Sequence, residues 1–309
     1  MNSKQATWVA TAGRFDIDDG HIIFRGDRAD TLGTLGDPVF GVIRSDIEFE
    51  QGSVEFEFRI SDPKASVQIA IPGGKSDLYA GINVMQAPYG FAAFRDGLTW
   101  EPKGGVGHGS APILNQWRRM RVVVDGSEIS LFVDGVNVVS TSFPTARGQL
   151  SFAFLGAAES EIRGISVNTR QPVAFVVMQF TDEFNSLYRE VIKPVCEQFS
   201  YRVVRADEFH TSTMIVEDIT RSLRESSVVI ADITPDNPNV FYEVGYAHAL
   251  DTPTILLSDK SRTRLPFDVS GLRTIFYNNT IAGKRDVEEA LTRHLTTLGE
   301  RWKSSGPRF

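Results

Sequence analysis

The feature that most constrains how this chain folds is a change in hydrophobic period near residue 170. Before it, apolar and polar residues alternate in short runs, as is typical of half-buried strands. After it, continuous apolar runs alternate with stretches of helical period. Because the chain has 309 residues, enough for two ordinary domains, we expect two domains that span residues 1–170 and 171–309.

The alternation is clearest at Ser53–Ile60 and Gln149–Phe154, and no long helical pattern interrupts the first domain. The dipeptides Asp125-Gly126 and Asp134-Gly135 stand between apolar runs. Asp-Gly supplies the left-handed backbone of a tight hairpin. These patterns predict an all-β sandwich.

A resemblance agrees with this prediction. The strand led by Trp117 and the run that ends in Val133-Asp134-Gly135 resemble concanavalin- and laminin-G-like jelly rolls. The likeness covers residues 5–168 and implies a jelly roll, to which we assign sensing or assembly, with a glycan or a protein as ligand. The motif is structural and does not identify that ligand.

The second domain repeats a strand followed by a helix. Its first strand, Ala174–Met178, is apolar throughout, as in a strand covered on both faces. The next helix contains Pro194, which predicts a kink or a boundary. Further strands are expected at 202–205, 228–231, 254–257 and 274–277, and helices at 215–225, 240–250 and 286–298. This alternation predicts an α/β domain with a doubly wound, five-stranded parallel sheet in the order 2-1-3-4-5.

Charge and composition exclude several classes of partner. The net charge of −7 is spread evenly, with 16 basic and 19 acidic residues from Pro172 onward and 16 and 20 before it. Neither domain therefore offers the basic surface that binds nucleic acid or an anionic membrane. No leader-like segment and no apolar stretch near the ~18 residues of a bilayer span occur, so we expect a cytoplasmic protein. The single cysteine, Cys196, suits a packed apolar residue, with a catalytic thiol as the alternative.

Open parallel sheets bind ligands beyond the carboxyl ends of their strands. The candidate ligand contacts in the loops at those ends are Gln179, Phe180, Arg205, Asp232, Asp236, Asn237 and Asn239. Arg205 suits either a phosphate contact or a surface ion pair with Asp207 or Glu208. Asp232 suits either a ligand contact or a cap on the loop that follows it.

The loop from Asp232 to Asn239 leads into a helix. Pro238 fixes the backbone where a helix begins and Asn237 suits its N-cap, so Glu243 falls on the first or second turn. The peptide dipoles there stabilise an ionised carboxylate by about 0.3–1 kcal/mol, which favours the nucleophilic form. A solvated charge is the alternative role for this glutamate.

The run Ala231–Ala247, with Glu-x-Gly-Tyr-Ala in its second half, resembles nucleoside 2-deoxyribosyltransferases and related nucleotide N-glycosidases. Their broader fold relatives include the NAD-cleaving TIR domains, so the resemblance, which covers residues 173–298, implies a flavodoxin- or TIR-like fold. In that family the glutamate of this helix attacks the anomeric carbon of the sugar and the base departs. Glu243 matches that position, and an oxocarbenium-like transition state suits a carboxylate there.

The resemblance also implies contacts with the substrate. Six residues before the glutamate, where the family usually has an aspartate that binds the sugar hydroxyls, this chain has Asn237, with Asp236 one position earlier. Asp218 falls near an acidic residue that contacts the leaving base. Phe267 lies in a loop that resembles one closing over the base, or is an ordinary loop anchor.

Another departure from the family lies in the first loop. It reads Met178-Gln179-Phe180 and lacks the Gly-Pro or Gly-x-Trp-Phe run of many members, which leaves the substrate class open. Neighbouring subunits complete the site in that family, so a homo-oligomer is expected. His248 suits a packed core residue, with catalysis as the alternative.

Three aromatic residues of the first domain, Trp100, His108 and Trp117, suit either a carbohydrate shelf or core packing. No clustered acidic motif indicates calcium, and we expect no metal and no cofactor.

The leading hypothesis is cleavage of an N-glycosidic bond, by hydrolysis or by glycosyl transfer, in a nucleoside, nucleotide or NAD-like dinucleotide, including the NAD cleavage of a TIR-like defence effector. The alternative is a module without catalysis that senses a nucleotide and binds a glycan or a protein. A third hypothesis makes both domains surfaces that assemble a filament or a ring.

Overall fold

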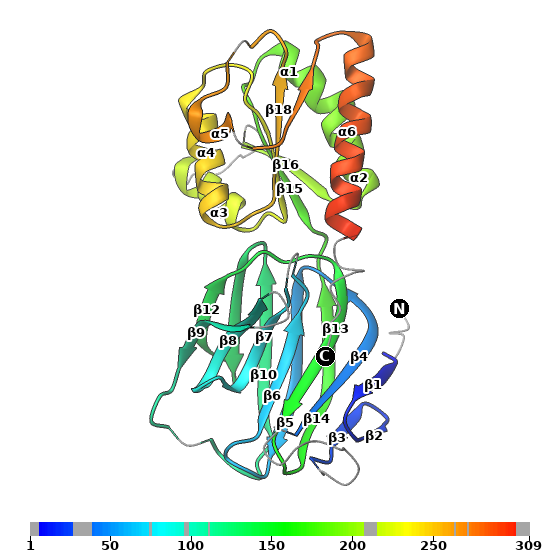
Figure 1. The fold of residues 1–309 in the computed structure, drawn as a ribbon, viewed down its shortest axis with the longest axis vertical. Coiled ribbons are helices and arrows are strands. Elements are labelled where there is room, and N and C mark those ends of the chain that lie inside the picture. Colours follow the sequence, from blue (N-terminus) through cyan, green and yellow to red (C-terminus); the bar gives the residue numbers. More distant parts are fainter. Residues whose placement is uncertain are drawn as a thin grey trace.

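The computed structural model describes residues 6–26, 39–73, 76–95, 99–110, 112–206, 215–262, 264–270 and 272–300. Within them the chain forms a β sandwich and, stacked on one end of it, a parallel sheet flanked by helices (Figure 1). The last strand of the sandwich ends at Thr169 and the first parallel strand begins at Val173. The change in hydrophobic period therefore coincides with the junction between the two parts.

Two antiparallel sheets of seven strands each make up the described part of the sandwich. The first sheet has the order β1 (Trp8–Ala12), β4 (Phe40–Phe49), β13 (Gly148–Leu155), β6 (Ser66–Ile71), β7 (Leu78–Val84), β8 (Ala87–Arg95) and β9 (Thr99–Val106). The second has the order β12 (Val136–Ser142), β11 (Glu128–Val133), β10 (Arg118–Asp125), β5 (Gly52–Ile60), β14 (Ser160–Thr169), β3 (His21–Phe24) and β2 (Phe15–Asp18). The predicted all-β, jelly-roll-like sandwich is confirmed at this level.

The alternating sequence explains the sandwich core. Along β5, the apolar residues Val54, Phe56, Phe58 and Ile60 are buried while the residues between them are half-buried. Phe56 meets Phe152 of the opposite sheet edge to face, with ring centroids 4.8 Å apart. Period-two burial on two facing sheets thus produces one continuous apolar core. The predicted strands at 53–60 and 149–154 are confirmed as β5 and β13.

The Asp-Gly dipeptides form the expected hairpin turns. Asp134 and Gly135 join β11 to β12 with φ values of 47° and 85°, and Gly126 joins β10 to β11 with φ of 62°. Residues with a left-handed backbone conformation match the twist of the flanking strands. The Asp-Gly dipeptides therefore allowed these hairpins to be predicted from the sequence.

The second part contains a parallel sheet of five strands. Their order is β16 (Arg202–Arg205), β15 (Val173–Val177), β17 (Val228–Asp232), β18 (Thr254–Asp259) and β19 (Thr274–Tyr277), and every neighbouring pair is parallel. Counted within this domain the order is 2-1-3-4-5, as predicted. The likeness to flavodoxin and TIR folds stays a prediction.

Helices pack on both faces of this sheet. The described helical segments are α1 (Asp182–Leu187), the π-helix η1 (Tyr188–Ile192), α2 (Lys193–Gln198), α3 (Ile215–Arg224), α4 (Pro238–Ala249), α5 (Phe267–Ser270) and α6 (Ile281–Glu300). One apolar cluster joins α1, η1, α2 and α6 to residues such as Val176 and Ile230. Another joins α3 and α4 to Phe175 and Val229, which point to the other face. Alternate residues of strands that are apolar throughout therefore supply two separate cores.

The first helix is interrupted where the sequence predicted. Tyr188–Ile192 forms a π-helix immediately before α2, in which Pro194 occupies the first turn. Since proline lacks the N–H that continues an α-helical ladder, a local change of helix type accommodates it. Cys196 in α2 is fully buried, and burial raises the pKa of its thiol to about 12, so the thiol is neutral and packs as an apolar group.

The described helices include none that is both long and apolar enough to cross a bilayer.

A turn of the sandwich caps a helix of the second domain. The backbone N–H of Ser127 donates to the carbonyl of Arg224, the last residue of α3, at 2.9 Å. Gln51 holds this turn in place, because its Oε1 accepts from Gly126 N at 2.6 Å and its Nε2 donates to Gly126 O at 3.2 Å. The helix end thereby gains a partner for a carbonyl that the helix itself leaves unsatisfied.

Candidate functional site

The carboxyl edge of the parallel sheet, where the sequence predicts the site, contains a closed hydrogen-bond network. Asp232 at the end of β17 is 1% exposed. It accepts 2.7 Å from the Tyr277 hydroxyl and 2.9 Å from the Thr234 backbone N–H. Burial raises the pKa of Asp232, and these two donors oppose the shift. Asp232 therefore caps the loop that follows it, which is one of its two predicted roles, and its contact with a ligand stays a prediction.

The loop after β17 is held by an arginine that the sequence analysis did not single out. Arg262 donates to Thr234 O at 2.9 Å and to Ile233 O, and it pairs with Asp236. Its side chain is 8% exposed while that of Asp236 is 84% exposed. Asp236 therefore lies at the surface and helps to fix Arg262 against the loop.

Asn237 and Pro238 begin α4 as predicted. Asn237 is the N-cap, and its side-chain oxygen accepts from Asn239 N at 3.0 Å. That oxygen satisfies a free helical N–H, and the Asn239 side chain is exposed. Asn237, which matches the sugar-binding position of the family, therefore caps α4 in the structure.

Glu243 on the second turn of α4 is buried. The residue is 9% exposed, and no described residue forms a hydrogen bond or an ion pair with its carboxyl group. Burial raises the pKa of Glu243 to about 7. The expectation that the helix dipole would favour the ionised form is corrected here, because loss of hydration outweighs a dipole effect of about 0.3–1 kcal/mol. The alternative of a solvated charge is also wrong.

Arg205 lies inside the domain, and the surface location that one of its two predicted roles required is wrong. It is 3% exposed, and its guanidinium lies 4.2 Å from the ring centroid of Tyr188 and 5.3 Å from that of Phe180. Phe180 itself is 50% exposed, so one ring of this group faces solvent. The proposed ion-pair partners Asp207 and Glu208 lie outside the described residues.

The remaining predicted contacts are scattered. Asp218 on α3 is 3% exposed and contacts Arg221 one turn later, and Gln179 is half-buried. Phe267 begins α5, and its side chain lies outside the described part of the chain. His248 is exposed, so the expectation of a packed core histidine is wrong. Among described residues, direct contacts therefore join Arg205 to Phe180 and members of the β17 loop to one another, but none joins either group to Glu243.

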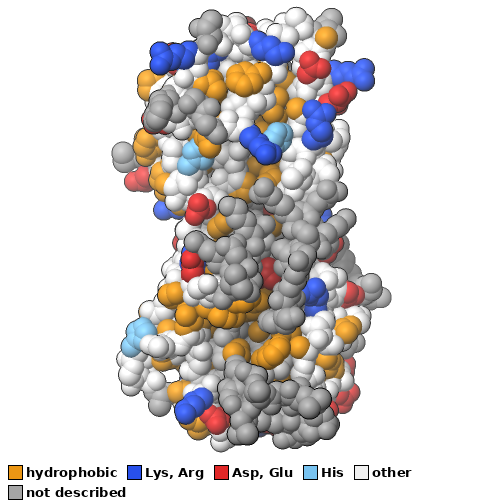
Figure 2. Space-filling view, viewed as in Figure 1, with side chains coloured by type: hydrophobic (Ala, Val, Ile, Leu, Met, Phe, Trp, Pro, Cys, Tyr) orange, Lys and Arg blue, Asp and Glu red, His pale blue; other side chains and the backbone are white. Residues whose placement is uncertain are grey.

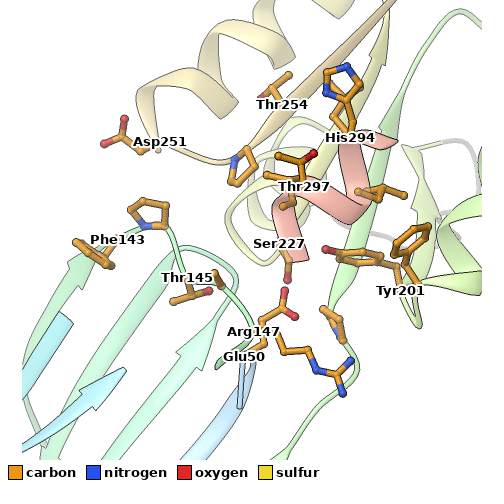
Figure 3. Close-up of a pocket in the computed structure, with 18 of the residues that line it drawn as sticks. Glu50, Phe143, Thr145, Arg147, Tyr201, Ser227, Asp251, Thr254, His294 and Thr297 are labelled. Carbon is orange, nitrogen blue, oxygen red and sulfur yellow. The ribbon is translucent and has the colours of Figure 1, made fainter. Parts of the chain in front are cut away.

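The amino edge of the same sheet faces the sandwich across a cavity of about 1450 Å³ (Figure 3). Residues at or just before the strand starts line it, namely Pro172, Tyr201, Ser227, Thr254 and Arg273. The opposite wall comes from sandwich residues that include Glu50, Phe143, Thr145 and Arg147. No sequence motif marked this cavity, because it arises from the way the two domains pack.

Glu50 follows β4 and points into the cavity towards Ser227 (Figure 3). Burial raises its pKa to about 7, while the Ser227 hydroxyl and the charge of Arg147 partly oppose the shift. The charge of Glu50 in turn contributes to raising the pKa of Tyr201 above its usual range, after burial as the main cause. A carboxyl group that titrates near neutral pH thus faces the second domain.

The predicted carbohydrate shelf of Trp100, His108 and Trp117 is not formed. Trp100 belongs to β9 of the first sheet, whereas Trp117 precedes β10 of the second. The guanidiniums of Arg163 and Arg59 lie 3.9 and 5.0 Å from the Trp117 ring centroid, and His108 is exposed just after the end of β9. Core packing does not describe Trp100 either, since it is 39% exposed.

The face of the first sheet that points away from the sandwich core, which we call the outer sheet face, has its own aromatic group. Trp100 packs against Tyr79 and Phe94 with ring centroids 4.9 Å away in both cases. Small buried residues, Ala70 and Ala153, complete this cluster. Over the sandwich in Figure 2, hydrophobic side chains gather in the middle of the visible face.

Polar groups also lie on this face. Gln68 is 5% exposed and donates to Ser66 Oγ at 2.7 Å, but its Oε1 is buried without a partner among the described residues. Burial raises the pKa of Asp77 to about 6, and the charge of Arg44 opposes this shift. Both charges also act on the hydroxyl of Tyr79. The outer sheet face therefore combines exposed aromatic surface with buried hydrogen-bonding groups.

Comparisons with known proteins give no family. No family model matches the chain and no curated protein matches it. Among solved structures it is similar to the carbohydrate-binding module CBM66 from Bacillus subtilis, with 13% identity over 51% of this chain and 92% of that one, at a TM-score of 0.42. A protein of unknown function with a galectin-like fold from Bacillus subtilis gives 12% identity over 51% and 87%, at a TM-score of 0.39.

A prokaryotic β-1,3-1,4-glucanase derived from a mouse hindgut metagenome gives 11% identity over 53% of this chain and 93% of that one, at a TM-score of 0.38. Likenesses at such identities and scores carry no argument about ligand or activity. The two seven-stranded antiparallel sheets themselves identify the sandwich, and the resemblance of the second domain to N-glycosidases stays a prediction.

Proposed function

We propose that the sandwich is a glycan-binding module and that its site is the outer sheet face. The observation that carries this proposal is Trp100, which is 39% exposed and packs against Tyr79 and Phe94 on this face. Gln68, whose buried amide oxygen has no partner among the described residues, lies on the same face on β6, three strands away from Trp100. A sugar presents apolar C–H faces and a rim of hydroxyls. An aromatic ring can stack on the apolar C–H faces, and amide or carboxylate groups can accept hydrogen bonds from the hydroxyls.

The energetics favour a ligand with hydroxyl donors. A buried acceptor without a partner costs about 1–3 kcal/mol, and a ligand hydroxyl that reached it would remove this penalty. Asp77 and Arg44 add a charged acceptor and a forked donor beside Tyr79. The small residues Ala70 and Ala153 leave the floor of the face low, so that a flat ring can approach Trp100.

Binding of the full-length protein to an array of immobilised neutral and acidic oligosaccharides tests this proposal, followed by calorimetry with the strongest ligand. We expect Trp100→Ala and Gln68→Leu each to weaken binding about tenfold or more, as for a central aromatic contact. Tyr242→Ala is the matched control, because Tyr242 is 56% exposed on α4 of the other domain. Absence of binding by the wild type, or unchanged binding by Trp100→Ala, would refute a glycan site on this face.

A second candidate function is N-glycosidic bond cleavage by the second domain, with Glu243 as the attacking carboxylate. A specific observation favours it: a carboxyl group with 9% exposure and no polar partner among described residues destabilises the fold, and such groups are concentrated at functional sites. The guanidinium of Arg205 between two aromatic rings suits the phosphate or the base of a nucleotide.

Incubation of the purified protein with nucleosides, nucleotides and NAD, followed by chromatography of the released base, tests this function. Glu243→Gln should lower release at least about a hundredfold, because the amide cannot attack the sugar. Glu217→Gln, which changes an exposed glutamate of α3, should remain within twofold of the wild type.

The rate should rise with pH through about 7, where Glu243 becomes ionised. No base release by the wild type with any of these substrates, or equal release by Glu243→Gln, would rule out catalysis by this residue and leave the α/β domain as a non-catalytic module.

A further inference from the structure

The cavity between the domains has a size and a position that suit a ligand. Its volume of about 1450 Å³ exceeds the roughly 300–1,000 Å³ of ordinary small-molecule sites. Both domains and the segment that joins them line it. A molecule bound there would touch the sandwich and the parallel sheet at once.

The wall contributed by the second domain carries unpaired positive charge. Arg273 immediately precedes β19, and Arg293 and His294 lie on α6. Neither arginine forms an ion pair with any described residue. The charges of both arginines act on His294 and, after burial, lower the pKa of its imidazole. Two guanidiniums and an imidazole therefore lie close enough to repel one another.

The sandwich wall does not balance this charge. Its basic groups already have partners on their own wall, since Arg147 pairs with Glu48 at 2.5 Å and Lys103 with Glu101 at 3.1 Å. Glu50, with a pKa of about 7, is only partly ionised at neutral pH. Asp251 is the acid on the wall of the second domain. Arg273 and Arg293 therefore form no ion pair with the described acids of either wall.

We propose that the interdomain cavity binds an anionic small molecule carrying phosphate or carboxylate groups, with Arg273 and Arg293 as its main contacts and His294 as an additional donor. Guanidinium forks match both kinds of oxyanion in geometry. Tyr201 and Ser227 line the cavity near Glu50 and offer hydroxyls to the uncharged part of the ligand (Figure 3). This site is separate from Glu243 and from the outer sheet face, so it does not depend on either proposed function.

Isothermal titration calorimetry of the full-length protein with pyrophosphate, and separately with citrate, tests the proposal. We expect at least one of the two to bind, and the comparison distinguishes a phosphate ligand from a carboxylate one. The double variant Arg273→Ala/Arg293→Ala should bind at least about tenfold more weakly. Arg285→Ala is the matched control, because Arg285 lies on the same helix, is 81% exposed and pairs with Glu289.

A conservative variant separates binding from folding. Arg273→Lys/Arg293→Lys keeps the positive charge without the fork, so its affinity should fall between the wild type and the double alanine variant. If neither anion binds at concentrations up to about 10 mM, where only very weak association would be missed, the proposal is overturned. An equal loss of affinity in Arg285→Ala would also overturn it.

A change on the sandwich wall tests whether the ligand lies between the domains. Ionised Glu50, which faces Ser227, Tyr201 and Arg147, should repel an anion above its pKa. Glu50→Gln should therefore tighten binding several-fold at pH 8 and leave it unchanged at pH 5.5. Equal affinities of Glu50→Gln and wild type at pH 8 would contradict a ligand placed between the two domains.

Discussion

The two edges of the parallel sheet differ in how their polar groups are used. At the carboxyl edge, Asp232 is satisfied by Tyr277 and Thr234, and Arg262 ties the loop down. At the amino edge, arginines without ion-pair partners among the described residues line a cavity that faces the sandwich. Ligands of parallel sheets commonly bind at the carboxyl edge, yet among the described residues the opposite edge has arginines without ion-pair partners beside a cavity.

Two glutamates have a pKa raised to about 7, namely the buried Glu243 on α4 and the half-buried Glu50, which faces the amino edge of the sheet from the sandwich. Burial raises the pKa of both carboxyl groups. Ser227 and Arg147 partly oppose the rise at Glu50, whereas none of the described residues opposes it at Glu243. A similarly raised pKa thus arises for Glu50 in a polar cavity and for Glu243 where α4 packs against the sheet. The comparison separates a carboxyl group that a ligand can reach from one whose neighbours leave it without a partner.

The largest effect on stability is expected from the two glutamates. The folded-state pKa of Glu243, about 7, lies above its ordinary value of 4.5, so the folded protein holds an extra proton between these pH values. The contribution of the Glu243 carboxyl to the free energy of unfolding is fully present below pH 4.5 and is lost as the pH rises through 7. Glu243→Gln should therefore stabilise the protein at pH 8 by up to about 3 kcal/mol more than at pH 4.

Urea denaturation at the two pH values measures this difference. Glu50→Gln should show the same direction with a smaller gain, since Glu50 is half-buried and has two groups that offset its burial. A gain for Glu243→Gln that did not depend on pH would mean that burial does not raise its pKa in the folded protein.

An intermediate effect is expected at the contact between the sandwich and α3. Gly126 has φ of 62°, and a Cβ there would lie 1.9 Å from Arg224 O. Gly126→Ala should destabilise the protein by about 2–3 kcal/mol, from backbone strain together with displacement of the helix end. Gly135→Ala controls for strain alone, because Gly135 has φ of 85° but open space around it. Equal losses in thermal unfolding would show that the turn does not hold the domains together.

The smallest effect is expected at the carboxyl edge. Tyr277→Phe removes the 2.7 Å hydrogen bond to Asp232 and should destabilise the protein by about 1–2 kcal/mol, because a buried carboxyl group loses one of its donors. Chemical denaturation at pH 7 measures the loss. Little effect on stability would indicate that Thr234 alone satisfies Asp232, and that the network is weaker than its geometry implies.

Local rules explain which parts of the structure were predictable. The alternation along Ser53–Ile60, the Asp134-Gly135 turn and the Asn237-Pro238 helix start each depend on a few neighbouring residues. They appear in the structure where the sequence placed them. The strand order also followed, because right-handed crossovers leave few arrangements for repeated strand and helix units.

The roles of charged residues were less predictable. Arg205 suited either a phosphate contact or a surface ion pair, and its guanidinium is buried against two aromatic rings. Arg262 stabilises a loop that ends more than twenty residues before it in the chain. Glu243 was expected to favour its ionised form, yet its surroundings raise its pKa. In each case the deciding term is burial by residues distant in sequence, which no local pattern contains.

The two hydrophobic periods can be recognised from the order of residues alone, and they predict a β sandwich joined to a parallel α/β sheet, because side-chain alternation and helical spacing follow directly from backbone geometry. Which polar groups are paired inside the protein depends instead on how the elements pack in three dimensions. The cavity lined by Glu50, Arg273 and Arg293 exists because two domains meet there, each of which could be predicted from its own part of the sequence. Desolvation and charge in such a place depend on three-dimensional proximity, which the order of residues does not state.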